Sequence, residues 1–78
     1  MKVYWARIGF SDRLVAAANE TMALKTLGLK RADKTRTKFK QWTRLDGYRP
    51  WNDALAAPGL VFKRLAGRTS DGWKRMLD

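Results

Sequence analysis

The sequence predicts an α+β domain in which a three-stranded antiparallel sheet, in the chain order β-β-α-(α)-β, has one or two short helices packed on it. Two observations support this prediction. Short apolar runs with partial alternation, bounded by turn residues, occur near both ends of the chain, and a segment with helix-capping signals lies between them. With 78 residues the chain has room for a single domain, which we place at residues 1–66, followed by a polar C-terminal tail over residues 67–78.

The first two strands are predicted at residues 2–9 and 13–18, and they form a hairpin. Gly9 and the following Ser11-Asp12 are turn residues. The third strand is predicted at residues 60–65, directly after the turn residues Pro58-Gly59.

A helix is predicted over residues 20–27. Asn19 is a favourable N-cap residue, Glu20 places an acid in the first turn, and Gly28 is a typical residue at a helix C-terminus. A second short helix is predicted over residues 50–57, because Pro50 is well tolerated in a first helical turn.

Residues 31–45 fit two structures. Read as a helix, apolar and small side chains recur at spacings of three and four residues, at Ala32, Thr35, Phe39, Trp42 and Leu45. Read as a strand, one face is wholly basic, with Lys34, Arg36, Lys38 and Lys40 alternating with Thr35, Thr37 and Phe39. We favour the helix, because its apolar stripe continues to Leu45. The tail contains either a short helix over residues 73–77 or no regular structure.

The predicted core comes from a short list of large apolar side chains. Trp5 and Phe62 are expected on adjacent strands, facing the helix over residues 20–27. The other candidates are Val3, Ile8, Leu14, Val15, Met22, Leu24, Leu27, Leu29, Phe39, Trp42, Leu55, Leu60 and Leu65.

Charge is the strongest functional signal. Lys and Arg number 17 against seven Asp and Glu, for a net charge of +10, so partners with negative surfaces are expected. Residues 30–49 hold a cluster of cations with aromatic residues among them, a combination typical of nucleic-acid binding. The expected binding residues are Lys30, Arg31, Lys34, Arg36, Lys38, Lys40, Trp42, Arg44, Tyr48, Arg49 and Trp51. The cations would contact phosphates, and Trp42, Tyr48 or Trp51 would stack or wedge; a solvated helix face with Phe39 and Trp42 in the core is the alternative interpretation.

Catalysis is not expected. The chain has neither Cys nor His, so the usual ligands of zinc, haem and iron–sulfur clusters are missing, and no cofactor is expected. Asp12, Asp46 and Asp71 each lie beside a predicted turn, and no phosphate-binding loop is present. No apolar run approaches the roughly 20 residues that span a bilayer, and Arg7 comes too early for a signal-peptide core. We therefore expect a cytoplasmic protein without a membrane partner.

Two resemblances extend this interpretation. Residues 22–32 resemble the first helix and turn of a helix-turn-helix, which would make residues 31–45 a recognition helix. Four short segments also resemble small proteins of plasmids and integrative elements with KfrB-type domains: Lys2-Val3-Tyr4, Val15-Ala16-Ala17, Ala23 to Leu29, and Ala57 to Phe62. This second resemblance implies a mobile-element origin and a β-β-α-β core, and it implies no activity.

The expected function is therefore non-catalytic nucleic-acid binding, to DNA rather than RNA, by a small basic protein of a phage, plasmid or other mobile element. The alternative is a mobile-element protein that binds an acidic surface of a host or defence protein and modulates or inhibits it. The sequence leaves the oligomeric state open.

Overall fold

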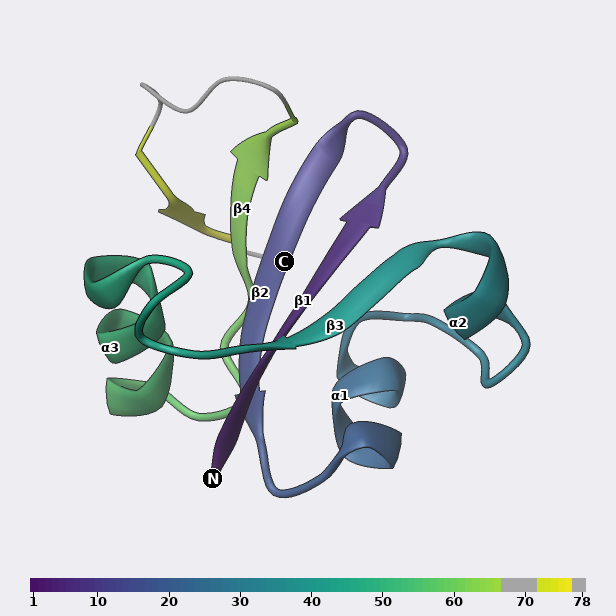
Figure 1. The fold of residues 1–78 in the computed structure, drawn as a ribbon, viewed down its shortest axis with the longest axis horizontal. Helices are drawn as coiled ribbons and strands as arrows, with labels where there is room; N and C mark the ends of the chain where they lie inside the picture. Colours follow the sequence, from purple (N-terminus) through teal and green to yellow (C-terminus); the bar gives the residue numbers. More distant parts are fainter. Residues whose placement is uncertain (67–71, 77–78) are drawn as a thin grey trace.

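The computed structural model describes residues 1–66 and 72–76 and shows a small α+β fold built on a five-stranded antiparallel sheet (Figure 1). The strand order is β3-β1-β2-β4-β5. The elements in chain order are β1 (Lys2–Ile8), β2 (Ser11–Ala17), α1 (Glu20–Thr26), α2 (Asp33–Arg36), β3 (Lys38–Trp42), α3 (Tyr48–Ala56), β4 (Phe62–Leu65) and β5 (Lys74–Arg75).

The α+β class is confirmed, and the three expected strands are present as β1, β2 and β4, which lie side by side. The sheet has two more strands than predicted, β3 beyond β1 and β5 beyond β4. Because Lys74–Arg75 pairs with β4, both alternatives for this part of the tail, a helix over residues 73–77 and no regular structure, are wrong for the residues described. The hairpin turn falls at Gly9-Phe10, and Ser11 and Asp12 already belong to β2.

The long helix favoured for residues 31–45 is also wrong. The chain forms the single-turn helix α2 and then strand β3, which pairs with β1 from Val3↔Trp42 to Arg7↔Lys38. Residues 39 and 42 share a helix face but lie on opposite faces of a strand. Phe39 stacks on Tyr4, with ring centres 5.8 Å apart, whereas Trp42 enters the cluster on the other face. Both aromatic residues find packing partners this way, and β1 gains a hydrogen-bonded neighbour.

The helix ends follow the sequence signals. The Asn19 side chain accepts a hydrogen bond of 2.9 Å from the backbone N–H of Met22, and Gly28 has a φ of 77° just after α1, which glycine adopts without strain. α3 begins at Tyr48, two residues before the predicted start, so Pro50 lies in its first turn.

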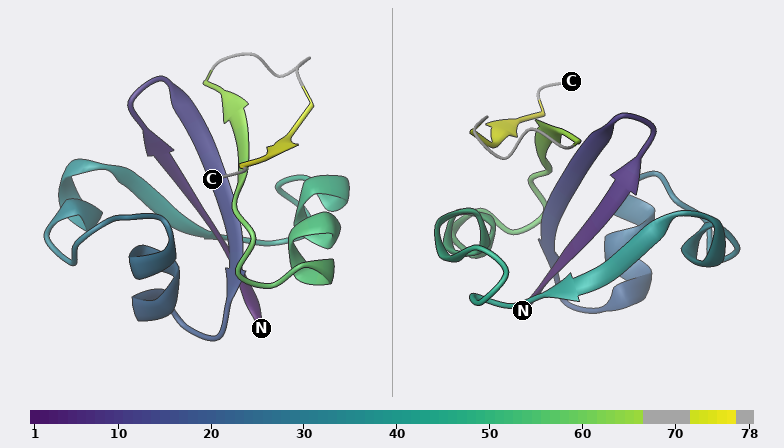
Figure 2. Two further views of the ribbon diagram at one scale, coloured as in Figure 1. Left: turned by 180° about the vertical axis from the view of Figure 1, so that it is seen from behind. Right: turned by 45° about the horizontal axis from the view of Figure 1, so that its top comes forward.

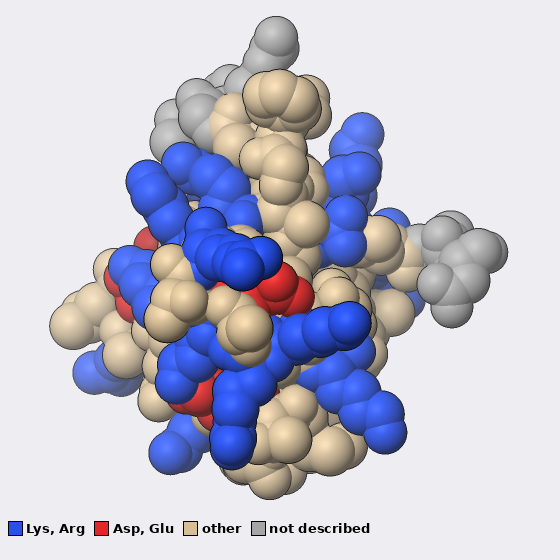
Figure 3. Space-filling model, turned by 90° about the vertical axis from the view of Figure 1, so that its right-hand side faces the viewer, with Lys and Arg blue, Asp and Glu red and all other residues tan. Residues whose placement is uncertain are grey.

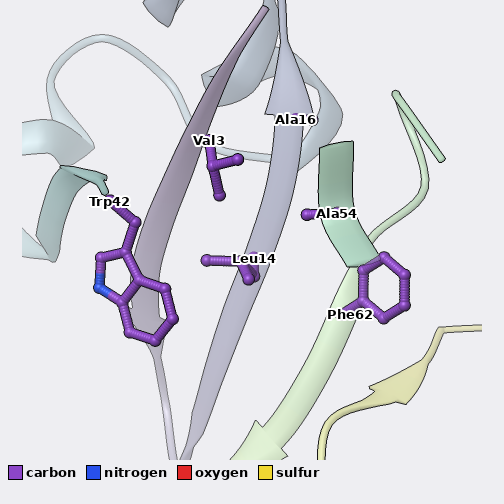
Figure 4. Packing of buried hydrophobic residues seen from close by; sticks show 6 residues of the cluster. All are labelled: Val3, Leu14, Ala16, Trp42, Ala54 and Phe62. Carbon is purple, nitrogen blue, oxygen red and sulfur yellow. The ribbon is translucent and has the colours of Figure 1, made fainter. Parts of the chain in front are cut away.

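The sheet is packed on both faces, and Figure 2 shows α1 and α3 on opposite sides of it. On one face Tyr4, Ala6, Val15 and Ala17 pack with α1. On the other face the cluster drawn in Figure 4 joins Val3, Leu14, Ala16, Trp42 and Phe62 to Ala54 of α3. Apolar residues at successive positions of β1 and β2 are therefore buried in both directions.

The expected placement of Trp5 and Phe62 needs correction. Both pack with the cluster on the α3 face rather than facing α1, and β2 separates their strands. Phe62 is buried, Trp5 is half-buried at the margin of the cluster, and the predicted core residues Met22 and Leu65 are exposed.

Candidate nucleic-acid interface

The predicted binding residues occupy five successive parts of the fold. Lys30 and Arg31 lie in the loop before α2, and Lys34 and Arg36 lie on α2. Lys38 and Lys40 point to the same face of β3. Arg44 lies in the turn after β3, and Tyr48, Arg49 and Trp51 lie in the first half of α3.

Strand β3 divides these residues into two groups. Lys38 is paired with Arg7, near the β1–β2 turn, and Trp42 is paired with Val3, near the start of β1. The five residues of β3 extend for about 13 Å at roughly 3.3 Å per residue. The cations of residues 30–38 therefore lie toward one end of β3, Lys40 lies at its middle, and the cations of residues 44–49 lie beyond the other end.

Most of these cations are exposed and have no acidic partner within 4.0 Å in the described part of the chain. The exceptions are Lys34, which forms an ion pair with Glu20, and Lys40, whose Nζ lies 3.5 Å from Asp46. Figure 3 looks onto the side of the molecule where α1, α2 and β3 lie and shows Lys and Arg over much of it, with small acidic areas between them. An anionic partner would find an electropositive surface there.

The three aromatic candidates differ in accessibility. Trp42 is only 8% exposed and packs edge-on against Trp73, with ring centres 5.7 Å apart. A base cannot stack on it without opening the core, so the expected stacking role of Trp42 is not supported. Trp51 is half-buried and packs against the cluster on the α3 face. Tyr48 is exposed, and the centre of its ring lies 6.1 Å from that of the Trp51 ring.

The turn after β3 is held by Asp46, as the sequence predicted. Its carboxylate accepts a hydrogen bond of 2.9 Å from the backbone N–H of Thr43. This bond lowers the pKa of Asp46 below its usual value, and the nearby Lys40 charge contributes in the same direction. The turn positions Arg44 between β3 and α3.

Asp12 does not have the turn role expected for it. It lies within β2, is 2% exposed, and accepts hydrogen bonds from Arg7 Nε at 2.9 Å and from Arg64 at 3.3 Å. The hydrogen bond to Asp12, followed by its charge, raises the pKa of Arg7. Asp71, for which a turn was also predicted, lies outside the described residues.

The predicted binding residues omit Arg7 and Arg64, two cations that lie near tryptophan rings on the α3 face of the sheet. Arg7 Cζ lies 5.6 Å and Lys40 Nζ lies 5.7 Å from the centre of the Trp5 ring. Arg64 Cζ lies 4.4 Å from the centre of the Trp73 ring. The signal available in the sequence was Arg7, which shares a face of β1 with Trp5. A cation at this position indicates that the face is not fully covered.

Other site types find no support in the described residues. The recognition helix of a helix-turn-helix is not formed, because residues 38–42 are a strand. Residues 1–66 and 72–76 contain no group of three or more acidic side chains arranged to hold a metal ion. No helix in this part of the chain has the length and apolar character to cross a bilayer.

Comparison with protein-family profiles, with curated proteins and with solved structures finds no match to this chain. The resemblance to KfrB-type domains therefore remains an expectation from the sequence.

Proposed function

We propose that this protein binds nucleic acid without catalysis, and DNA rather than RNA. The observation that supports the proposal is the excess of exposed cations along residues 30–49, of which only Lys34 and Lys40 form ion pairs with acidic side chains in the described part of the chain. Clustered like charges repel one another and disfavour folding. A polyanion that binds them relieves this repulsion and releases its condensed counterions.

In this proposal the cations contact phosphates at two separate places on the protein. Lys30, Arg31, Lys34, Arg36, Lys38 and Lys40 contact phosphates around α2 and β3, and Arg44 and Arg49 contact phosphates near the start of α3. Tyr48 is the accessible ring of the second group and stacks on a base or sugar. Trp51 is half-buried and packs against the cluster on the α3 face, so its main role in this proposal is structural.

A salt series with a matched pair of variants tests the proposal. One variant replaces four cations of the basic segment by Ala, at Lys34, Arg36, Lys38 and Lys40. The control replaces four exposed lysines elsewhere, at Lys2, Lys25, Lys63 and Lys74, so that both proteins lose the same charge. Fluorescence anisotropy with labelled duplex DNA, single-stranded DNA and RNA gives the slope of log K against log salt concentration.

The first variant should bind more weakly, with a slope flatter by up to about 0.9 for each phosphate of the duplex that the protein no longer neutralises. The control should show the smaller change that follows from net charge alone. Equal reductions of the slope in the two variants would mean that the basic segment is not a binding site, and a wild-type protein that binds none of the three ligands would refute the function.

Binding to an acidic host or defence protein is the second candidate, and one observation favours it. Leu45 is 90% exposed in the turn beside Arg44, and Tyr48 is exposed close by. Contact between an exposed leucine and a phosphate adds little to the binding free energy, whereas burial of the leucine in a protein interface strengthens binding. Leu45→Ser should weaken a protein complex and leave DNA affinity unchanged. In either case, the origin in a phage, plasmid or other mobile element is an expectation from the sequence resemblance.

A further inference from the structure

Trp5, Arg7, Lys38 and Lys40 form one block on the α3 face of the sheet. Trp5 is paired with Lys40 and Arg7 with Lys38 across β1 and β3, and residues two apart in a strand share a face. We propose that this block, the Trp5 surface, binds a single strand of nucleic acid by stacking an unpaired base on Trp5 while the three cations contact its phosphates. The inference rests on the proposed nucleic-acid binding and specifies the form of nucleic acid that is bound.

The Trp5 surface lies where the cover provided by α3 ends. At the other end of β1 and β3, Val3 and Trp42 are buried in the cluster that includes Ala54 of α3. Lys38 and Lys40 are exposed, and Arg7 and Trp5 are partly exposed. A shallow hollow lined by Trp5, Lys38, Phe39 and Lys40 opens beside the indole ring.

The geometry around Trp5 suits stacking between cations. Arg7 and Lys40 lie 5.6 and 5.7 Å from the ring centre, within the roughly 6 Å over which a cation is attracted to an aromatic ring. The indole Nε1 of Trp5 is buried and has no hydrogen-bond partner among the described residues. The accessible part of the side chain is therefore carbon, which favours stacking over hydrogen bonding to a base edge.

Asp12 fixes Arg7 without repelling a phosphate. One carboxylate oxygen of Asp12 accepts from Arg7 Nε and the other from Arg64, so both oxygens are occupied by guanidinium groups. Only Nε of Arg7 is used in this contact, and its side chain is 37% exposed. Its terminal nitrogens are left to contact a ligand, and Asp12, which is buried, offers no exposed negative charge beside them.

The size and shape of the Trp5 surface favour a single strand over a duplex. Neighbouring bases cover both faces of a base in a duplex, whereas an unpaired base has a face free to stack on an aromatic side chain. The block measures about 5 Å across the two strands and about 7 Å along them. It lies flat on a face of the sheet. An element that reads a duplex has to project into the major groove, which is about 12 Å wide, and the Trp5 surface does not project.

Trp5→Leu tests the stacking, because it keeps apolar volume at the core margin and removes the aromatic ring. Anisotropy at about 150 mM salt compares labelled oligothymidylate with a duplex of equal length. We expect Trp5→Leu to weaken binding of oligothymidylate by about 5- to 150-fold and to leave duplex binding unchanged. Near-ultraviolet circular dichroism checks that the variant is folded.

A pair of lysine variants keeps the test decisive if Trp5→Leu does not fold. Lys38→Gln/Lys40→Gln should flatten the salt slope for oligothymidylate by about 1.4, at roughly 0.7 for each phosphate contact on a single strand. The control Lys25→Gln/Lys63→Gln removes the same charge from α1 and from the opposite face of β4, and it should leave the slope nearly unchanged.

The outcomes separate this inference from the function on which it rests. A folded Trp5→Leu that binds oligothymidylate as the wild type does overturns the Trp5 surface, as do equal slope changes in the two lysine pairs. In both cases binding by the wild type still supports the proposed function. A wild-type protein that binds neither ligand overturns both.

Discussion

Replacing Asp12 by Ala should lower the free energy of unfolding by about 3 kcal/mol. Removing one partner of a buried ion pair costs about 3–5 kcal/mol, because the remaining charge is left without compensation. Asp12 is almost fully buried, but its partners Arg7 and Arg64 have side chains that are 37% and 18% exposed. Water can therefore replace part of the interaction that Asp12 provides, which places the expected cost at the lower end of that range.

This destabilisation is large for so small a protein. At roughly 0.05–0.15 kcal/mol per residue, the 78 residues have a total stability of about 4–12 kcal/mol. At about 4–8 °C for each kcal/mol, Tm should fall by about 12–24 °C. Urea unfolding at pH 7 measures the change, with Asp53→Ala as control. Asp53 is exposed on α3, and its replacement should change stability by less than about 0.5 kcal/mol.

A double-mutant cycle locates the source of the effect. Arg64→Met, made alone and together with Asp12→Ala, should give a coupling energy of about 0.5–3 kcal/mol, as expected for residues in direct contact. A cost below about 1 kcal/mol for Asp12→Ala, which is the range of an exposed pair, would refute the reasoning. A coupling near zero would also refute it.

Three further predictions concern the α3 side of the fold. Phe62→Ala should cost about 3–5 kcal/mol, because Phe62 is buried beside Leu14; a wild-type urea midpoint would contradict the packing described. Trp51→Ala should lower Tm while leaving DNA affinity of the folded protein unchanged, since Trp51 packs against the core cluster; weaker binding at an unchanged Tm would make it a ligand contact instead. The lowered pKa of Asp46 means that its contribution to stability is present above the ordinary value of 3.8 and is lost as the pH falls through the lower folded value. Tm between pH 5 and pH 2.5 should therefore fall further for the wild type than for Asp46→Asn, and parallel curves would contradict this.

Local signals were sufficient for part of the fold. The apolar runs of β1, β2 and β4 and the capping residues of α1, Asn19 and Gly28, act over a few residues, so they can be recognised without knowledge of the rest of the chain. The order of these strands could not be anticipated in the same way: Trp5 and Phe62 were expected on adjacent strands, whereas β2 lies between β1 and β4.

The edge strand β3 could not be predicted in the same way. Residues 31–45 satisfy a helical period about as well as a strand period, and isolated short helices are marginal without tertiary packing. What decides between them is the open edge of β1, some 35 residues earlier in the sequence, which offers hydrogen bonds from Val3 to Arg7. The helical pattern of residues 31–45 is overridden by pairing with β1, a partner that the local sequence does not reveal.

The candidate site shows the same limit. Counting charge along the sequence finds residues 30–49 but groups Lys38 with Arg49, which lie toward opposite ends of β3. It also omits Arg7, which is paired with Lys38, and it assigns Asp12 to a turn. The contact between Asp12 and Arg64 joins residues 52 positions apart, so no inspection of neighbouring residues could reveal it.

The lysines of β3 have a second physical explanation, which bears on the Trp5 surface. β3 is an edge strand, and charged side chains on an edge discourage pairing with another chain. This explanation requires charge on β3 but places no requirement on β1. It leaves unexplained why Trp5 is half-exposed between Arg7 and Lys40, and why a buried carboxylate holds Arg7 in place. Binding of single-stranded nucleic acid would use all of these side chains. A loss of affinity for oligothymidylate in Trp5→Leu is therefore the result that protection of the sheet edge alone does not produce.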